Sequence, residues 1–340
     1  MDENIIRSLL ATLEEYHRLG IAEQIDYQKF YLYSIITHST AIEGSTVTEI
    51  ENQLLFDEGI AAKGRTMVEQ LMNLDLKAAY EEAMRMAPKR VPFSTEMLQG
   101  LSALVMKNTG SKYSTLSGTF DSSKGELRKV NVTAGIGGRS YLNFLKVPSR
   151  LADFCQNMNE RQKQLENDND IIAQYALSFD AHNLLVAIHP WVDGNGRMSR
   201  LVMNYIQMEY GLVPTKVLKD DRAEYIQALV DAREQESLEP FRDFMFRTHL
   251  RNLQQEIAAY KQSIEDDVTI PEVEPQHVVK DVVKEILAIL KAQPESTAAS
   301  IAERVHLSSR QVQRIMARLQ KDGSIMRHGG RKEGYWEVKH

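Results

Sequence analysis

Apolar side chains recur at helical spacing through most of the chain up to about residue 262. Residues 171–188 show the pattern clearly, because Ile172, Tyr175 and Phe179 fall on one face of a helix that turns once in about 3.6 residues. The spacing is interrupted at 190–196 and then resumes until Gly211, a typical helix end. This part of the chain is therefore expected to be mainly α.

Residues 128–141 (RKVNVTAGIGGRSY) break the helical pattern. Their β-branched side chains alternate with other residues around three glycines, which predicts a short β-hairpin.

A different pattern follows an expected linker at residues 263–276, which is acidic, holds two prolines and lacks periodicity. Residues 277–340 predict three helices and a two-stranded wing. The first helix carries an apolar stripe, the second is N-capped by Ser296, and the third opens on a capping box formed by Ser308 and Gln311. The wing strands are expected at 324–327 and 335–338.

Composition narrows the class of protein. A chain of 340 residues holds about two domains, and 26% charged with 43% hydrophobic residues excludes a disordered or fibrous protein. The longest apolar runs have five residues, so no membrane span is expected, and no apolar leader opens the chain. Cys155 is the only cysteine, which excludes an internal disulfide and favours a packing role in a reducing, cytoplasmic compartment.

Charge is distributed unevenly. Residues 276–340 hold 12 Lys and Arg against 7 Asp and Glu, a balance of +5, and the remaining 275 residues hold 29 against 40, a balance of −11. An acidic body repels polyphosphate backbones. Any nucleic-acid surface is therefore expected in the C-terminal segment.

Residues 189–200 (HPWVDGNGRMSR) hold the densest group of chemically useful side chains. A helix should stop at His189, because Pro190 disfavours helical geometry in the residue before it. A tight turn over 193–196 should follow, with a new helix from about Gly196. The unpaired N–H groups and positive end of that helix make an anion site.

The side chains around this turn complement an anion. Arg197 and Arg200 are three residues apart, where both can donate paired hydrogen bonds to phosphate oxygens. Asp193 suits a divalent metal, and His189 can accept a proton near neutral pH. Each residue alone fits an ordinary helix corner, but their combination within twelve residues indicates a site.

The segment resembles the signature of Fic proteins, HPFx(D/E)GNGRxxR, and departs from it only where Trp191 replaces Phe. The resemblance covers roughly residues 30–250 and implies a mainly α Fic helical core with a β-hairpin flap, plus a small C-terminal winged-helix domain. It places an N-terminal helical region at 1–100 and the Fic core at 101–262. It also implies a protein adenylyltransferase, a nucleotidyltransferase that moves AMP from ATP to a Tyr, Thr or Ser hydroxyl.

The resemblance assigns roles to these residues. His189 would deprotonate the target hydroxyl, and Asp193 would coordinate Mg²⁺ between the phosphates of ATP. Gly194, Asn195 and Gly196 would form the anion hole. Arg197 and Arg200 would bind the β- and γ-phosphates.

The same resemblance assigns residues farther from the motif. The 128–141 hairpin would be the flap that docks the target protein, through Thr133, Ala134 and Gly135. Residues 220–232 would close over the adenine and ribose, with Tyr225 as the candidate contact and Asn204 as a further nucleotide-side candidate. Arg233 stands where many relatives have Asn.

Residues 39–44 (STAIEG) fit the inhibitory pattern (S/T)xxxE(G/N) of the self-inhibited Fic class. In that class the glutamate, here Glu43, pairs with the second motif arginine, here Arg200, and ATP then binds unproductively. Ser39 and Gly44 complete the pattern. Some members use this glutamate to remove AMP from modified targets, so that reverse reaction is also open.

Residues 277–340 resemble a winged helix-turn-helix. If the module binds DNA, its third helix offers side chains to the major groove and its wing offers Arg327, Arg331 and Lys332 to phosphates. A protein-docking role is the equal alternative, while Tyr335 and Trp336 are expected in the core. The groove-facing side chains would be Arg310, Gln311, Gln313 and Arg314.

Three functions remain open from the sequence. The first is a self-inhibited AMP transferase, the second a DNA-binding regulator whose Fic core senses a nucleotide, and the third a Fic enzyme that transfers UMP, phosphate or phosphocholine. Relatives often pair through the core, so a homodimer is an expectation from the resemblance.

Overall fold

The chain folds into two compact units, Met1–Lys261 and Gln262–His340, and is mainly helical. This computed structural model describes residues 3–24, 26–134, 139–165, 169–268, 278–305, 312, 315–316, 319–320, 323–328 and 335–339.

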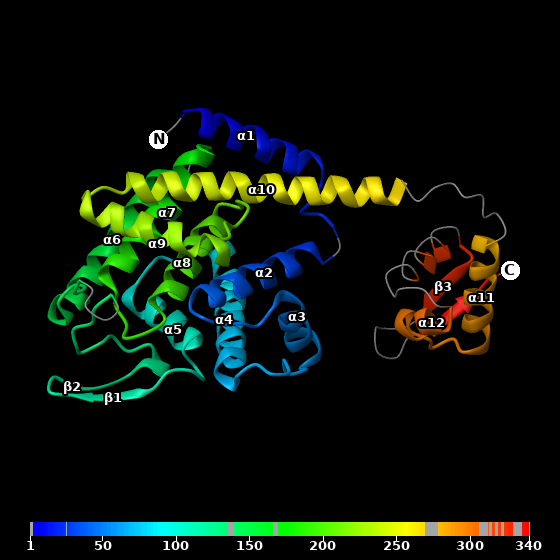
Figure 1. Ribbon diagram of the computed structural model, residues 1–340, viewed down its shortest axis with the longest axis horizontal. Coiled ribbons are helices and arrows are strands. Elements are labelled where there is room, and N and C mark those ends of the chain that lie inside the picture. Colours follow the sequence, from blue (N-terminus) through cyan, green and yellow to red (C-terminus); the bar gives the residue numbers. More distant parts are fainter. Residues whose placement is uncertain are drawn as a thin grey trace. The chain divides into compact units, whose positions relative to one another are not determined.

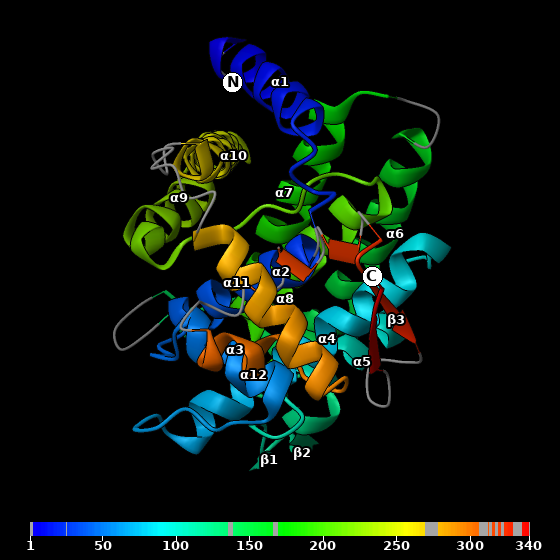
Figure 2. The same ribbon diagram turned by 90° about the vertical axis from the view of Figure 1, so that its right-hand side faces the viewer.

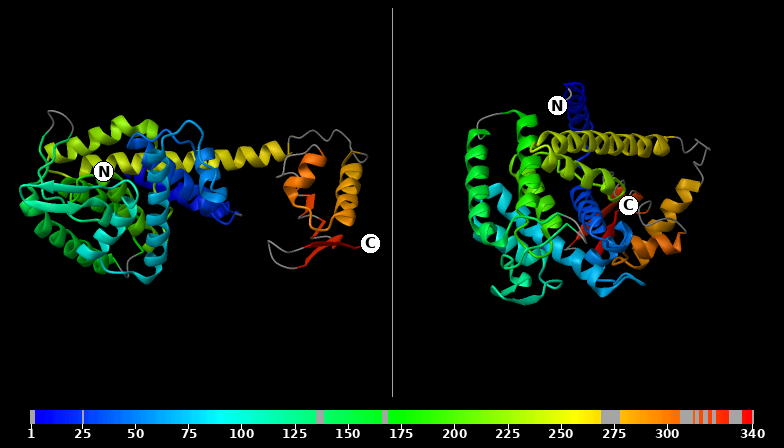
Figure 3. Two further views of the ribbon diagram at one scale, coloured as in Figure 1. Left: turned by 90° about the horizontal axis from the view of Figure 1, so that it is seen from below. Right: turned by 60° about the vertical axis from the view of Figure 1, so that its left-hand side comes forward.

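The first unit is built around α7 (Ile171–Ile188) and α8 (Asn195–Glu209), which form its most extensive helix–helix contact among the described residues. Their buried faces belong to one apolar core that also holds Cys155, whose thiol pKa is raised to about 11 by burial. Figure 3 shows α6 alongside α7 in its right-hand view. The other helices are α1 (Glu3–Arg18), α2 (Tyr27–Ile42), α3 (Glu49–Glu58), α4 (Met67–Met86), α5 (Thr95–Val105), α6 (Val147–Leu165), α9 (Arg222–Glu234) and α10 (Glu239–Val268).

Helix α10 runs past α1 in Figure 1 and is seen end-on in Figure 2, and its His249 and Phe246 rings contact Tyr175 and Phe179 of α7. Lys261 on α10 pairs with Glu15 on α1 at 2.7 Å. The helix runs to Val268, six residues into the segment 263–276 that was predicted as a linker. The prediction placed the end of this helix too early. The first proline of the segment is Pro271, and no residue before it breaks a helix.

Capping residues fix where several of these helices begin. Thr48 before α3 and Thr66 before α4 each form a complete capping box, with Glu51 and Glu69 as the reciprocal partners. The box at Thr48 fixes the start of α3 shortly after residues 39–44.

The strands of the first unit differ from the prediction. A regular hairpin forms from β1 (Lys112–Thr115) and β2 (Gly118–Asp121), at the edge of the unit, where no strand was expected (Figure 1). In the predicted hairpin 128–141 the structure contains one isolated antiparallel bridge, between Thr133 and Ser140. Its central residues 135–138, including Gly135, lie outside the described residues.

The second unit contains α11 (Val278–Ala292), α12 (Ala298–Arg304) and a two-stranded sheet of β3 (Ile325–His328) and β4 (Tyr335–Val338). Thr297 caps α12, one residue after the predicted Ser296. Trp336 packs against the small apolar core as expected, whereas Tyr335 is 49% exposed, contrary to the prediction. The capping box at Ser308 and the groove-facing residues 310, 311, 313 and 314 lie outside the described residues.

Among the described residues, α7 alone has the length and apolar content of a membrane span, which the longest apolar runs had not suggested. A core helix of a folded domain passes the same test, and half of this window is buried. Asp180 near its middle is fully buried and pairs with Arg161 of α6 and Arg242 of α10. One carboxylate therefore ties three helices together.

We expect Asp180→Asn to lower the free energy of unfolding by about 3 kcal/mol, because the change leaves the half-buried Arg161 without its anion and Arg242 with Glu239 alone. Chemical denaturation would measure it. The matched control is Asp153→Asn, which breaks an exposed pair with Arg150 and should change stability by less than about 0.5 kcal/mol. Equal effects of the two variants would contradict the assignment.

Candidate active site

The corner between α7 and α8 is held by backbone and side-chain contacts that the motif itself supplies. His189 follows α7 with φ of 51°, and Gly194, with φ of 79°, precedes α8. The Asn195 side chain accepts from the Trp191 N–H and donates to the Trp191 carbonyl. The buried Trp191 indole donates to the Gly125 carbonyl at 3.0 Å. The corner is thus rigid before any ligand binds.

Arg128, which sequence reasoning did not select, attaches the flap segment to this corner. Its buried guanidinium donates to the carbonyls of His189 at 2.7 Å, Val130 at 2.7 Å and Leu142. The backbone N–H of Arg128 also donates to the Pro190 carbonyl at 3.1 Å. Both ends of the predicted flap are therefore held at the motif.

The arms of the flap segment face each other and reach the motif histidine. Ala134 donates to the Arg139 carbonyl, and Tyr141 donates to the Val132 carbonyl. The Tyr141 ring stacks on His189 with a centroid distance of 3.7 Å and an interplanar angle of 17°. Tyr141 is a second residue that sequence reasoning missed.

His189 is neutral at physiological pH. Burial, together with the positive charge of Arg128, lowers the pKa of its imidazole to about 4. Its buried Nδ1 has no hydrogen-bond partner among the described residues. The ring is therefore available to accept a proton.

Glu43 occupies the anion position that the sequence predicts at the start of α8. A Cβ atom placed on Gly196 would lie 2.2 Å from Glu43 Oε1 and 3.1 Å from Arg200 Nη1. Glu43 Oε1 also accepts from Arg200 Nη2 at 2.7 Å. Only a glycine at position 196 leaves room for this carboxylate against the helix end.

Arg200 has four acceptors, which come from α2 with its C-cap and from α9. Its Nε donates to Ser39 Oγ at 2.8 Å. Its Nη2 donates both to the Ser39 carbonyl at 2.8 Å and to Glu43. Its Nη1 lies 3.3 Å from the Tyr225 hydroxyl, which is 3.0 Å from His182 Nε2. Burial and the charge of Arg200 lower the pKa of His182 well below its usual value, so this imidazole is neutral.

Arg197 points elsewhere. Its buried guanidinium lies 3.8 Å from Asp193 and contacts the Val105 carbonyl and the Met106 sulfur at the end of α5. The sequence analysis placed Arg197 and Arg200 on one side, where both could reach phosphate. In the structure the two guanidinium groups have different partners, Asp193 for one and Glu43 for the other.

A cavity of about 880 Å³ opens beside the motif. Glu43, Thr133, Ala134 and His189 line it, together with the turn from Asp193 to Gly196. Side chains from α7, which sequence reasoning did not select for the site, and from α9, within or next to the predicted segment 220–232, also line it. These are Asn183, Val186, Arg222, Ile226, Leu229, Val230 and Arg233.

Four predicted nucleotide contacts are absent from the walls of this cavity, namely Arg197, Arg200, Asn204 and Tyr225. Tyr225 is buried and faces Arg200 instead. Asn204 is buried in a network with the Tyr80 hydroxyl, Gln207 and the Thr215 carbonyl. Both side chains are buried in the protein interior and bind neighbouring residues there. They do not face the cavity, because positions on a helix that are one or two residues apart point in different directions.

The predicted metal ligand Asp193 is 65% exposed in its side chain. One of its oxygens accepts from the Gly194 N–H at 2.6 Å. No cluster of three His, Cys, Asp or Glu side chains suited to a metal occurs in the described part of the chain.

The sequence model of the Fic/DOC family matches residues 92–207, which include the motif, its corner and the flap segment. The chain carries a Fic domain. A model described as winged helix-turn-helix DNA-binding matches residues 281–326, in the second unit. Glu43 and α9 lie outside the matched Fic range.

Curated relatives from Drosophila are named protein adenylyltransferase Fic. The one from Drosophila grimshawi is 29% identical over 213 residues, which is 62% of this chain and 40% of the relative. The one from Drosophila willistoni is 27% identical over 252 residues, 72% of this chain and 46% of the relative. This chain spans less than half the length of these relatives.

Solved structures support the Fic fold. Fic-1 (residues 134–508) from C. elegans aligns with a TM-score of 0.61 at 23% identity and covers 76% of this chain and 72% of that one. A Fic family protein from Desulfovibrio desulfuricans G20 aligns with a TM-score of 0.59 at 20% identity over 100% and 97% of the two chains.

The Glu43–Arg200 pair predicts a pH-dependent contribution to stability. Burial opposes ionisation of Glu43, but the Arg200 charge and hydrogen bond outweigh it and hold the pKa of Glu43 below its usual 4.5. The stabilisation that the ion pair gives the folded state should be complete above pH 4.5, the usual pKa of a glutamate. It should disappear as the pH falls through the lower pKa that Glu43 has in the folded protein. At pH 7, Glu43→Gln should cost about 2 kcal/mol, and the difference from wild type should shrink on acidification.

Denaturant unfolding between pH 7 and 3.5 measures this difference. Glu14→Gln, at an exposed position of α1, serves as the control and should match the wild type throughout. A Glu43→Gln cost that persists unchanged at the acid end would show that the charge is not responsible.

Proposed function

We propose that this protein transfers AMP from ATP to a hydroxyl of a target protein and that Glu43 holds it in an inhibited state. The observation that carries the proposal is the position of the Glu43 carboxylate, against Gly196 at the start of α8 and on Arg200. Helix N-termini and arginines bind phosphate as well as carboxylate. The names of the Drosophila relatives support AMP as the transferred group.

In the proposed reaction His189 acts as the general base. Its neutral imidazole takes the proton of the target hydroxyl as that oxygen attacks the α-phosphorus of ATP. The new bond joins the target oxygen to the α-phosphorus, and the bond to the bridging oxygen breaks, so pyrophosphate leaves. Stacking against Tyr141 and the corner fixed by Arg128 keep the imidazole plane oriented.

The start of α8 supplies charge stabilisation. The N–H groups at Gly194, Asn195 and Gly196 would hold phosphate oxygens, and Arg200 would bind the outer phosphates once Glu43 leaves. Asp193 would hold Mg²⁺, which partly neutralises the triphosphate. Its mainly exposed carboxylate fits this role, since Mg²⁺ is commonly bound by one or two carboxylates plus substrate phosphates.

Glu43 and the outer phosphates compete for the same guanidinium. While Glu43 accepts from Arg200 Nη2, that N–H cannot bind a phosphate. Ser39 and Tyr225 contact the guanidinium independently of Glu43. Loss of the Glu43 carboxylate should therefore leave Arg200 oriented and one donor free.

A labelling assay with α-labelled ATP and Mg²⁺ tests the proposal. Glu43→Gly should incorporate at least about tenfold more label than wild type, because Arg200 is released. Adding His189→Ala to Glu43→Gly should lower labelling by a factor of about 100 or more, as expected for loss of a general base.

Controls identify the cause of any labelling. Glu58→Gly, at the end of α3, should label like wild type. ATP labelled at the γ-phosphate should give no signal in any variant, which distinguishes AMP from phosphate transfer. If Glu43→Gly incorporates no label into itself or into lysate proteins although it binds ATP, AMP transfer is excluded. If it instead loses the ability to remove AMP from a modified target, the reverse reaction is the activity.

We also propose that the second unit binds DNA, on the basis of the winged-helix match over residues 281–326. The full-length protein should bind a mixed-sequence 30-base-pair duplex in 50 mM salt and bind it at least tenfold more weakly at 200 mM, because phosphate contacts release counterions. Arg310→Ala/Arg314→Ala should weaken binding about tenfold or more. Arg85→Ala, on α4 of the first unit, is the control. Absence of binding at 50 mM would favour protein docking.

A further inference from the structure

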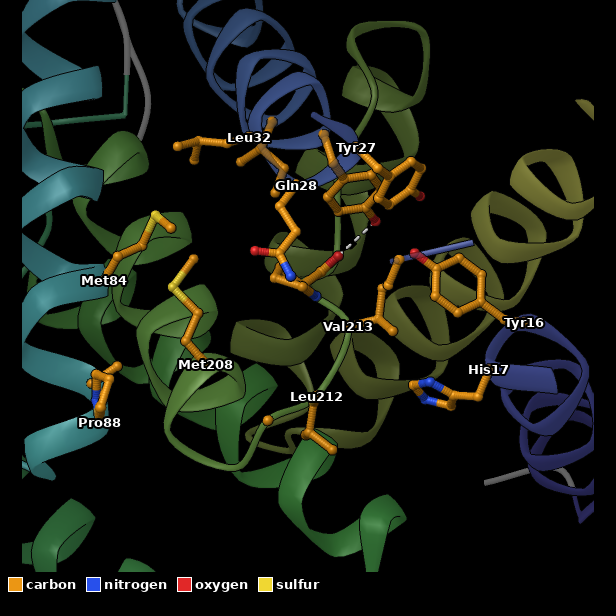
Figure 4. Close-up of a pocket in the computed structure, with 16 residues that line it drawn as sticks. Tyr16, His17, Tyr27, Gln28, Leu32, Met84, Pro88, Met208, Leu212 and Val213 are labelled. Carbon is orange, nitrogen blue, oxygen red and sulfur yellow. Dashed lines mark hydrogen bonds between the residues drawn. The ribbon is translucent and has the colours of Figure 1, made fainter. Parts of the chain in front are cut away.

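A second cavity, of about 350 Å³, lies in the first unit at the ends of α2 and α8 that are far from His189. The first half of α2 forms one wall, and the end of α8 with the following loop forms another. Figure 4 shows Leu32 and Gln28 of α2 across from Met208 and Leu212, with Tyr16 and His17 of α1 on a third side. Nothing in the proposed reaction uses this cavity.

The walls of this cavity are aromatic, thioether and aliphatic. Tyr27 and Tyr31 stack on each other at a centroid distance of 5.6 Å, and Met84 and Met208 supply polarisable sulfur. None of the described lining residues is Asp, Glu, Lys or Arg. Apart from the His17 imidazole, a charged ligand would find no counter-charge in this lining and would lose hydration. The chemistry therefore favours an uncharged, planar aromatic molecule.

One polar group is available to orient such a ligand. The Gln28 amide points toward the middle of the drawn side chains and has no hydrogen-bond partner among the described residues (Figure 4). The Tyr31 hydroxyl already donates to the Pro214 carbonyl at 2.7 Å, and the Tyr27 hydroxyl donates to Glu256 at 3.1 Å. Gln28 can both donate to and accept from a ring substituent.

The two helices that form this cavity also position Glu43 and Arg200, which are the inhibitory pair of the proposed function. On α2, cavity residues Tyr31 and Ile35 are followed at intervals of four by Ser39 and Glu43. On α8, Met208 is preceded at intervals of four by Asn204 and Arg200. Residues four apart lie near one another along one side of a helix. The same sides of α2 and α8 thus run from the cavity to the pair.

A hydrogen-bonded loop connects the two helices between these ends. The Pro214 carbonyl accepts from Tyr31 of α2, and the next carbonyl, of Thr215, accepts from Asn204 of α8 at 3.0 Å. Asn204 is buried and lies one helical turn from Arg200. A shift of Tyr31 is therefore transmitted by direct contacts to the helix that presents Arg200.

We propose that this cavity is an effector site for an uncharged planar aromatic molecule, and that filling it weakens the hold of Ser39 and Glu43 on Arg200. The regulatory part rests on the proposed function, whereas the binding part does not. A ligand larger than the existing cavity would push Tyr31 away from Met208 and so shift α2 relative to the end of α8. Linkage then requires that breaking the inhibitory pair tighten the binding of the ligand.

The binding experiment uses N-phenyl-1-naphthylamine, an uncharged fluorescent aromatic amine, with the full-length protein and no nucleotide. Fluorescence should rise to saturation at one dye per chain. Leu32→Trp, which fills the cavity, should raise the dissociation constant at least tenfold, and Met84→Trp should do the same from the rim. Ile50→Trp adds the same ring at an exposed position of α3 and should leave binding unchanged.

Two results would overturn the site. One is a lack of saturable binding to wild type. The other is equal binding by wild type and by whichever of Leu32→Trp and Met84→Trp retains the wild-type melting temperature.

The coupling experiment compares dye affinity in Glu43→Gly and wild type. We expect Glu43→Gly to bind the dye at least fivefold more tightly, with Glu58→Gly equal to wild type. Equal affinity in Glu43→Gly and wild type would overturn the regulatory part while leaving the site. Neither measurement requires AMP transfer, so failure of the labelling assay would count against the proposed function alone.

Discussion

The guanidinium of Arg200 is a positive charge with almost no access to water, and the surrounding structure depends on satisfying it. Its side chain is 3% exposed. An unpaired buried cation costs several kcal/mol, so each donor needs an acceptor. Two come from Ser39, one from Glu43 and one from Tyr225. Segments far apart in sequence are thereby fixed around one side chain.

His189, a few residues earlier in the chain, is also buried, but its side chain is uncharged. A guanidinium has a high intrinsic pKa, and although burial opposes its charge, the acceptors around Arg200 raise that pKa further. An imidazole starts near neutrality, and burial together with the charge of Arg128 lowers the pKa of His189. One corner of the fold therefore holds a permanent cation beside a neutral imidazole.

The sequence predicted what depends on local geometry. A proline after His189 and glycines around Asn195 define the helix corner. The contact between Glu43 and Arg200, 157 residues apart, was predicted only from the resemblance of STAIEG to the inhibitory pattern. Other long-range contacts could not be predicted from the sequence. Arg128 appeared as one residue of a hairpin, and only the fold brings its guanidinium to the His189 carbonyl. Tyr225 and α9 lay in the expected segment, but the side of the helix facing the cavity was misassigned.

Glu43 lies outside the matched Fic range, at the C-cap of α2. The end of this helix lies against α8, where Ser39 in its last turn and Glu43 at its C-cap both contact Arg200. In the proposed function, the inhibited and released states would differ in the Glu43–Arg200 ion pair, whose net free energy we expect to be about 2 kcal/mol. A factor of ten in population corresponds to about 1.4 kcal/mol. A ligand or partner with modest preference for a displaced α2 would therefore suffice to change the population of the released state.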